Sequence, residues 1–285
     1  MNLEVLSIAQ NNLGDTLKFD MFFDMSHFTY LDLSYNNLSL LFGGTNTNAT
    51  LSKFKLVVLC SCNLTEFPFF LRYQRKLEWL DLSENKIYGQ VPKWMQNTSQ
   101  ETLMWMSLGN NFLTSFHQST TILPWVSLRV MDLSSNMLEG SQPIPPPSTI
   151  HYDVSNNRLN GEISPLICNL SHLLVLDVSN NNFSGMIPHC LGNFSDSLLV
   201  LNLRNNSFNG IIPLSCTKAS NLRMIDFSDN QFQGILPQSL VTCTMLESLD
   251  LANNQLVDVF PSWLGSLPEL KHLILKQNRF YELEK

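Results

Sequence analysis

A repeating frame of apolar residues runs through the whole chain and constrains its fold more than any other feature. The frame reads L-x-x-L-x-L-x-x-N-x-L, with other residues replacing leucine at some positions. It begins twelve times, near residues 3, 28, 54, 77, 103, 128, 149, 173, 198, 222, 246 and 270. The mean spacing is about 24 residues, and a period of that size predicts a solenoid of stacked coils.

Each frame predicts one short strand, because its middle section alternates apolar and polar residues with a period of two. In the fourth repeat, Leu80 and Leu82 are expected to face a core, and Asp81 and Ser83 to face away from it. The strand is followed by a turn of the Gly-x-Ile-Pro type in several repeats, at residues 89–92, 185–188, 210–213 and 234–237. Proline favours an extended or short helical return after this turn.

Stacking these coils predicts an α/β-type solenoid, a right-handed and curved stack of leucine-rich repeats. A parallel β-sheet would line its concave side, and irregular, 3-10 or polyproline returns its convex side. At about 4.8 Å per strand, twelve strands would extend roughly 55 Å. We expect a single domain over residues 1–285, without caps. Two segments depart from the rhythm: a polar loop at residues 43–50, and a short, proline-rich repeat at residues 128–148.

The ninth position of the frame is asparagine in every repeat but the third, where Cys62 takes its place. An amide on a short stem carries two donors and an acceptor, so stacked asparagines can bond the backbone where each coil leaves its strand. We expect a structural ladder of Asn11, Asn36, Asn85, Asn111, Asn136, Asn157, Asn181, Asn206, Asn230, Asn254 and Asn278. A thiol replaces an amide only weakly in this role.

The composition agrees with a folded protein and excludes some functions. Apolar residues make up 44% of the 285 residues and charged residues 14%, so a continuous core can form. The net charge of −7 argues against nucleic-acid binding. No apolar run approaches the roughly 18 residues of a membrane span, and the first residues do not resemble a signal peptide. No catalytic or cofactor motif is present, so we expect neither an enzyme nor a cofactor.

The chain resembles the extracellular leucine-rich repeats of plant receptor-like proteins, the class of the Cf-type disease-resistance receptors. The resemblance rests on the L-x-G-x-I-P turn and on whole segments such as CNLTEFPFFL and FPSWLGSLPELKHLILKQNRF. Members of that family also have a signal peptide, a cysteine-bearing cap, a non-repeat island and a membrane helix. The resemblance therefore implies a fragment of the repeat region, and uncapped end coils would expose apolar core and lower solubility.

The resemblance implies a non-catalytic function at the cell surface. It implies recognition of an extracellular peptide, protein or carbohydrate, in defence, with signalling through an adaptor receptor kinase and a co-receptor kinase. Three alternatives remain open. The chain could be a secreted inhibitor similar to the polygalacturonase-inhibiting proteins, a developmental peptide receptor, or a non-functional truncated remnant.

Side chains that depart from the repeat on the concave face are the candidates for ligand binding. Large aromatic or imidazole side chains stand at the third position of the frame, and charged side chains lie around them. The candidates are Tyr30, Trp79, Trp105, His151, Glu78, Arg129, Arg204 and Arg223. Against this, a tryptophan can simply cover a neighbouring strand. A row of Asp and Ser at the fifth and seventh positions could attract a basic ligand, but lateral bonding between coils is its expected role.

Modification sites complete the predictions. Eight sequons predict N-glycosylation in a secreted chain, at Asn37, Asn48, Asn63, Asn97, Asn169, Asn182, Asn193 and Asn205. Cys168 and Cys190 lie at nearly the same point of consecutive coils, which favours a disulfide. Cys216 and Cys243 are expected as buried free thiols. Cys60 and Cys62 lack further ligands nearby, so no metal site is expected.

Overall fold

The computed structural model describes residues 2–22, 25, 27–42, 54–116, 122–191, 197–213, 216 and 220–282. It divides the chain into two compact units, Met1–Leu138 and Glu139–Lys285. We describe each unit by itself and call them the first and the second unit. Whether the repeats form one domain over residues 1–285 stays a prediction.

The first unit is built on parallel strands, each contributed by the middle of one repeat. In sheet order they are β1 (Val5–Ser7), β3 (Tyr30–Asp32), β5 (Leu56–Val58), β6 (Trp79–Asp81), β8 (Trp105–Ser107) and β10 (Val130–Asp132). Neighbouring strands pair in register, so equal repeat positions lie opposite one another. Leu56 pairs with Trp79, and Trp79 with Trp105. The period therefore sets the register directly.

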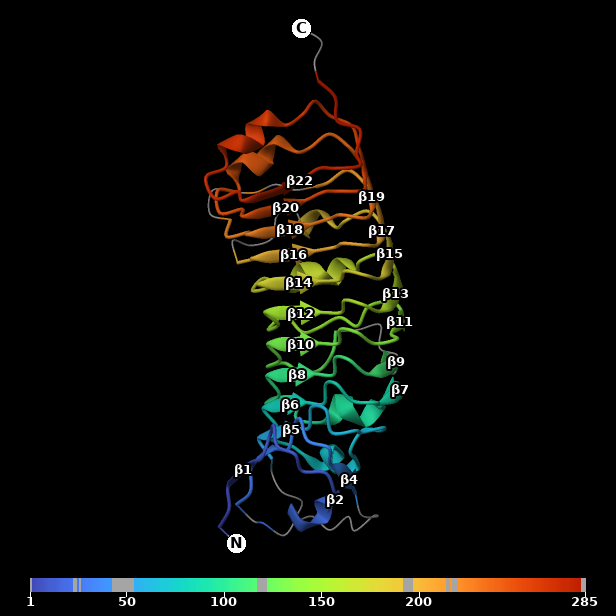
Figure 1. Ribbon diagram of the computed structural model, residues 1–285, viewed down its shortest axis with the longest axis vertical. Helices are drawn as coiled ribbons and strands as arrows, with labels where there is room; N and C mark the ends of the chain where they lie inside the picture. Colours follow the sequence, from blue (N-terminus) through green and yellow to red (C-terminus); the bar gives the residue numbers. More distant parts are fainter. Residues whose placement is uncertain are drawn as a thin grey trace. The chain divides into compact units, whose positions relative to one another are not determined.

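The second unit repeats this arrangement. Its first sheet contains β12 (His151–Asp153), β14 (Val175–Asp177), β16 (Val200–Asn202), β18 (Met224–Asp226), β20 (Ser248–Asp250) and β22 (His272–Ile274). Figure 1 shows β14, β16, β18, β20 and β22 stacked one above another along one side of the coils. The parallel coil stack confirms the predicted solenoid fold class.

A second sheet forms where the sequence predicted only a turn. In the second unit it contains β11 (Glu139–Gly140), β13 (Arg158–Gly161), β15 (Asn182–Gly185), β17 (Ser207–Gly210), β19 (Gln231–Gly234) and β21 (Gln255–Leu256). The first unit has two shorter pairs, β2 (Thr16–Lys18) with β4 (Ser39–Leu41) and β7 (Tyr88–Val91) with β9 (Phe112–Phe116). Gly185, Gly210 and Gly234 close these strands with φ of +78° to +84°, a backbone conformation that glycine adopts without strain.

Several returns contain a single 3-10 turn, one of the forms that the sequence predicted for them. These turns are η1 (Phe19–Phe22), η2 (Phe69–Tyr73), η3 (Lys93–Asn97), η4 (Pro165–Asn169), η5 (His189–Leu191), η6 (Gln238–Thr242) and η7 (Ser262–Ser266). Prolines directly precede η3 and η6, at Pro92 and Pro237, where the fixed φ favours a tight turn. The proline-rich residues 143–147 form no helix.

The core lies between the first sheet and the returns. Leucines of the frame such as Leu80 and Leu82 are fully buried. In the first unit, the returns add an aromatic cluster in which Phe19 stacks on Phe70 with ring centroids 4.4 Å apart. Trp125 is fully buried as well, and its Nε1 donates to the backbone carbonyl of Thr98 at 3.0 Å. Apolar burial of this extent is the main stabilising contribution to each coil.

The asparagine ladder bonds the backbone of two coils at each step, and Asn181 shows the pattern. Its Nδ2 donates to the carbonyl oxygens of Val178 at 3.2 Å and Ser179 at 3.0 Å in its own coil. The same Nδ2 lies 2.9 Å from the carbonyl oxygen of Val154 in the preceding coil. Its Oδ1 accepts the N–H of Leu159 at 3.0 Å. One side chain thus satisfies four backbone groups and joins adjacent coils.

Cys62 interrupts the ladder and leaves a backbone donor without an acceptor. Its Sγ lies 3.5 Å from the carbonyl oxygen of Leu33 and 3.6 Å from that of Cys60, which are weak bonds. Burial raises the pKa of this thiol to about 12, so it stays protonated. The equivalent of the N–H that Asn181 accepts is the N–H of Leu38, which has no acceptor among the described residues.

We therefore expect Cys62→Asn to stabilise the protein by about 1–2 kcal/mol, because the amide supplies the missing acceptor and stronger donors. Chemical denaturation of the two chains measures the difference. Cys62→Ala is the matched control, since it removes the thiol without adding an amide, and it should not stabilise. Equal unfolding free energies for Cys62→Asn and Cys62→Ala would contradict the role assigned to the ladder.

Two disulfides join the returns of the second unit. Cys168 and Cys190 form the expected bridge, with Cα atoms 5.6 Å apart. The expectation of free thiols at Cys216 and Cys243 is wrong, because these residues form a second disulfide across a Cα distance of 5.3 Å. Their consecutive returns bring the two backbones within the range that a disulfide requires. Cys60 and Cys62 are free and buried.

The residue before the ladder asparagine adopts a left-handed conformation in every repeat, with φ between 51° and 57°. The set is Gln10, Tyr35, Ser61, Glu84, Asn110, Ser135, Asn156, Asn180, Asn205, Asp229, Asn253 and Gln277. Asparagine and aspartate tolerate this conformation better than other non-glycine residues, which agrees with their frequency at this position. The turn directs these side chains toward the edge of the first sheet.

Candidate functional site

The side of the first sheet that faces away from the core carries the candidate residues, and we call it the open face. It presents the third, fifth and seventh positions of each repeat. In the first unit, the third positions hold adjacent apolar side chains, which we call the apolar strip: Val5, Tyr30, Leu56, Trp79, Trp105 and Val130. Tyr30 is 37% exposed and Val5 54%. An apolar strip on a solvent-facing sheet indicates an interaction surface.

Trp79 and Trp105 stack on each other at the centre of this strip. Their ring centroids are 4.0 Å apart and their planes differ by 6°. Both side chains are half-buried, so the stack covers neighbouring strands and also presents ring surface to solvent. The Nε1 of Trp105 is buried and has no acceptor among the described residues. The two readings of these tryptophans, packing and ligand contact, are therefore compatible.

Carboxylates line the strip at the fifth position. Asp81 Oδ1 accepts the N–H and the hydroxyl of Ser83, at 2.9 and 2.6 Å. Its Oδ2 has no hydrogen-bond partner among the described residues. Asp132 accepts from Ser134 in the same way and from the hydroxyl of Ser107 at 2.9 Å. Burial raises the pKa of Asp81, and the nearby charge of Asp132 adds to the rise.

These bonds correct the role predicted for the row of Asp and Ser. The expected lateral bonds between coils occur at Ser7 with Asp32, at Ser107 with Asp132, and from Asn202 to Asp177. Elsewhere the aspartate bonds the residue two positions later in its own coil, as Asp81 does. The reason is the turn after the strand, which places that N–H beside the carboxylate.

Charged candidates of the first unit lie at the border of the strip. Glu78 forms an exposed ion pair with Lys55, whose Nζ is 3.4 Å from the Glu78 Oε1. Arg129 is exposed one repeat beyond Trp105. Tyr35 donates its hydroxyl to Glu84 at 3.0 Å, passing over the intervening coil. Exposed pairs of this kind contribute little to stability, so they leave the surface adaptable.

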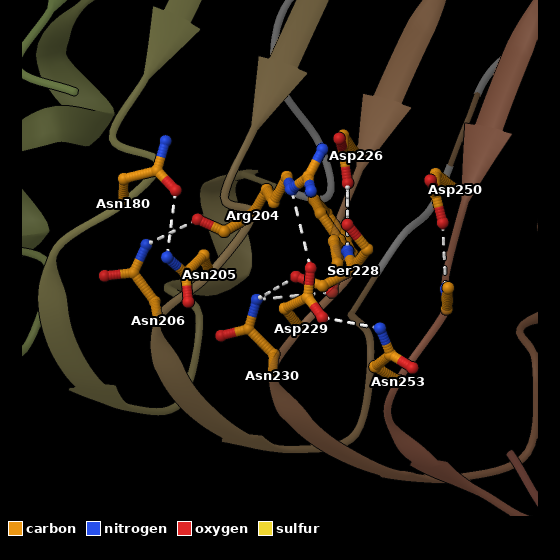
Figure 2. A network of polar contacts seen from close by, with 12 residues as sticks. Asn180, Arg204, Asn205, Asn206, Asp226, Ser228, Asp229, Asn230, Asp250 and Asn253 are labelled. Carbon is orange, nitrogen blue, oxygen red and sulfur yellow. Dashed lines mark hydrogen bonds and ion pairs between the residues drawn. The ribbon is translucent and has the colours of Figure 1, made fainter. Parts of the chain in front are cut away.

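The second unit holds the remaining candidates, His151, Arg204 and Arg223, on its own open face. The Nε of Arg204 lies 3.4 Å from an oxygen of Asp229, whose other oxygen accepts from Asn253. Figure 2 shows Arg204 extending across its coil toward Asp229, beside the bond between Asn205 and Asn180. His151 is half-buried in β12. These contacts place Arg204 over a group of carboxylates.

Arg223 belongs to a separate ion-pair row at the border of this face. Its guanidinium lies 2.6 Å from Glu247, and the Nζ of Lys271 lies 2.8 Å from the other oxygen of Glu247. Hydrogen bonds from Lys271, and then from Arg223, lower the pKa of Glu247. The three residues come from consecutive repeats at the same position. Arg223 is thus already paired within the chain.

The sequon asparagines that the structure describes are all exposed: Asn37, Asn63, Asn97, Asn169, Asn182 and Asn205. Two of their side chains make hydrogen bonds: Asn205 donates its Nδ2 to the Oδ1 of Asn180 at 2.9 Å, and Asn63 accepts from Lys86 at 3.1 Å. The predicted sites at Asn48 and Asn193 lie outside the described residues. Glycosylation of these positions stays a prediction.

One feature of the surface was missed by the sequence reasoning. Met186, Ile211 and Ile235 follow the turn glycines of three consecutive coils and are 65%, 62% and 67% exposed. They border the second sheet on the other side of the coils from the open face. The sequence feature that could have indicated them is an apolar residue directly after the turn glycine. The repeat frame assigns no core position to that residue.

Two kinds of site find no support in the described part of the chain. No group of three or more His, Cys, Asp and Glu side chains there is arranged to hold a metal ion. None of its helices has the length and apolar character needed to cross a bilayer.

Comparison with known proteins identifies the repeats. The leucine-rich-repeat family matches residues 24–40, 76–98, 172–194 and 196–256. Receptor-like protein 7 of Arabidopsis thaliana is 45% identical over 140 residues, which are 49% of this chain and 14% of that protein. Receptor-like protein 54 of the same plant is 36% identical over 65% of this chain and 24% of its own length. The chain spans less than a third of these relatives.

Solved structures agree. The ectodomain of the Arabidopsis thaliana membrane receptor kinase GASSHO1/SCHENGEN3 superposes with a TM-score of 0.83 and 29% identity. That match covers 98% of this chain and 33% of the receptor. The plant peptide hormone receptor RGFR1 gives a TM-score of 0.74 and 27% identity over 98% of this chain and 48% of its own. From its repeats, its fold and these relatives, the chain belongs to the plant leucine-rich-repeat receptor-like proteins.

Proposed function

We propose that this chain forms extracellular ligand-recognition repeats of a plant receptor-like protein, and that the open face of the first unit binds an extended peptide. The observation that carries the proposal is the apolar strip with the stacked Trp79 and Trp105 at its centre. Large, rigid aromatic side chains of this kind dominate the energetics of protein recognition surfaces.

The dimensions and the polar groups of the strip fit a peptide. Six strands at about 4.8 Å span about 24 Å, which an extended peptide of roughly seven residues would cover. The buried Trp105 N–H finds no acceptor among the described residues, and a peptide carbonyl could supply one after a small shift of the ring. Both solved receptors described above contain a bound partner: CASPARIAN STRIP INTEGRITY FACTOR 2 in GASSHO1/SCHENGEN3, and RGF2 in RGFR1.

The wider role follows from the family. We place the chain on the extracellular side of the plasma membrane, glycosylated on exposed sequons such as Asn97 and Asn169. After binding the peptide, the receptor would signal through partner membrane receptor kinases. The proposed biological role is the perception of pathogens. The proposed contacts of the second unit are His151, Arg204 and Arg223, while Tyr30, Glu78 and Arg129 border the tryptophan stack.

A peptide-display selection against the full chain tests the proposal. We expect selected peptides to bind Trp79→Ser/Trp105→Ser at least tenfold more weakly, because two central contacts are lost. The matched control is Trp94→Ser/Trp263→Ser, two tryptophans on returns, which should change the affinity less than threefold. Equal losses in both double variants, or binding that survives removal of Trp79 and Trp105, would overturn the proposal.

A further inference from the structure

Both open faces carry aspartates at the fifth repeat position, and among the described residues an arginine extends over this face only in the second unit. In the second unit, Arg204 occupies the seventh repeat position and its Nε lies 3.4 Å from Asp229. Burial raises the pKa of the neighbouring Asp250, and the positive charge of Arg204 opposes that rise. A guanidinium therefore lies over the aspartates of this face, as Figure 2 shows.

The first unit has no cation in the equivalent place. Its seventh positions next to the tryptophan stack hold Ser83, Gly109 and Ser134. Asp81 and Asp132 take part in no ion pair within the described residues, and Lys55 is engaged by Glu78 at the border of the strip. The carboxylates beside the stack are thus held by hydroxyls and backbone amides alone.

Gly109 allows one of these carboxylates to lean over the neighbouring coil, which carries Trp105. A Cβ at Gly109 would lie 2.9 Å from Oδ2 and 3.2 Å from Oδ1 of Asp132, which is closer than side chains normally approach. The carboxylate therefore occupies the space that a side chain would fill. Ser107, in the same coil as Trp105, donates to the same Oδ2 at 2.9 Å. Both contacts draw Asp132 over the coil that carries Trp105.

The stack supplies a second attraction for positive charge. Stacking covers one ring face of each tryptophan, and both side chains stay half-exposed, so a ligand can contact the ring surface that is left. Residues two apart along a strand point to the same side, so Asp81 lies beside Trp79 on the open face. A cation over a tryptophan face is attracted by the ring, and the attraction grows when carboxylates lie beside it.

We propose that Trp79, Trp105, Asp81 and Asp132 form a subsite for one guanidinium or ammonium side chain of the bound peptide. The inference rests on the proposed peptide-binding function of the open face and adds the chemistry of one ligand residue. Arginine fits best, because its planar group can stack on an indole and donate hydrogen bonds to a carboxylate.

The test uses a small probe in place of the unknown peptide. The full chain is labelled at its five tryptophans with nitrogen-15, and the indole signals are assigned by single substitutions. N-butylguanidinium is titrated against it, with the neutral isostere N-butylurea as a matched probe. We expect saturable shifts of the Trp79 and Trp105 signals with the cation only. The signals of Trp94, Trp125 and Trp263 report whether the fold is intact.

Variants locate the binding. Asp81→Asn and Asp132→Asn keep an oxygen for the serine bonds, so the fold should survive. Each substitution should lower the affinity for N-butylguanidinium at least fivefold. Asp226→Asn is the matched control, because Asp226 makes the same bonds with Ser228 in the second unit. It should leave the shifts unchanged. Equal shifts with the urea, or shifts that persist in the Asp81 and Asp132 variants, would overturn the subsite.

The display selection separates this inference from the proposed function. Selected peptides that need Trp79 and Trp105 but contain no basic residue would leave the function standing and remove the subsite. Failure to select any peptide, with cation shifts that depend on Asp81 and Asp132, would remove the function and leave the subsite standing. Enrichment of one arginine or lysine among the selected peptides would support both.

Discussion

Replacing Asn181 by alanine is expected to lower the free energy of unfolding by about 2–4 kcal/mol. The substitution removes four hydrogen bonds and takes away the acceptor of the Leu159 N–H. The carbonyl groups of Val154 and Val178 each keep one donor, from Asn157 and Asn206. The net contribution of each bond is about 0.5–1.5 kcal/mol, and unsatisfied groups add to the cost. Because the lost bonds join two coils, the damage should extend to the neighbouring repeat.

Chemical denaturation measures the total loss, and amide hydrogen exchange shows where it occurs. We expect faster exchange in strands β12 and β14, on both sides of the broken step. The control is Asn160→Ala in the same unit, an exposed asparagine outside the ladder, which should change stability by less than about 0.5 kcal/mol. A loss as small as that of the control would contradict the ladder as the link between coils.

Removing the disulfide between Cys168 and Cys190 is expected to cost about 3 kcal/mol. The bridge closes a loop with a sequence separation of 22 residues, and most of its effect comes from restricting the unfolded chain. The double variant Cys168→Ser/Cys190→Ser should therefore unfold at a lower denaturant concentration than the oxidised chain. Serine is close in size to cysteine, so the folded packing changes little.

The second disulfide gives an internal comparison. Cys216→Ser/Cys243→Ser removes a bridge with a separation of 27 residues, so the loss should be of similar size. Reducing agent should lower the stability of either double variant further, because one bridge remains in each, and it should have no effect when all four cysteines are replaced. Unchanged stability in Cys216→Ser/Cys243→Ser would show that these thiols are free, as the sequence reasoning expected.

The repeat period determined most of the fold, because it fixes register as well as coil number. Equal positions of consecutive frames pair in the first sheet, as Trp79 does with Trp105, so their adjacency followed from the spacing alone. The ladder was also predictable, since only asparagine recurs at a position that must satisfy backbone groups of two coils. The left-handed residue before it left a weaker signal, because glutamine, glutamate and tyrosine occur there too.

The second sheet and the second disulfide were not predictable from the same pattern. Strands such as β15 and β17 are too short to show alternation, and their pairing depends on how the backbone leaves the ladder. Cys216 and Cys243 occupy positions that are apolar in other repeats, so composition favoured burial as free thiols. Only the geometry of the returns brings their Cα atoms to 5.3 Å.

The candidate site divides in the same way. Shared repeat positions predicted that Trp79 and Trp105 lie together, and the structure adds their parallel stacking. The lean of Asp132 over Gly109 and the pairing of Arg204 with Asp229 depend on side-chain rotamers. Contacts of that kind have no period, so a repeat pattern contains no information about them.

The central claim is that the open face of the first unit recognises a peptide. Hydrogen exchange of the full chain with and without a display-selected peptide tests it most directly, because it reports the protected segments without assuming which residues bind. We expect the bound peptide to slow amide exchange in β6, β8 and the turns that follow them, around Trp79 and Trp105. Protection confined to the second sheet, at the exposed row of Met186, Ile211 and Ile235, or to the 3-10 returns, would contradict it.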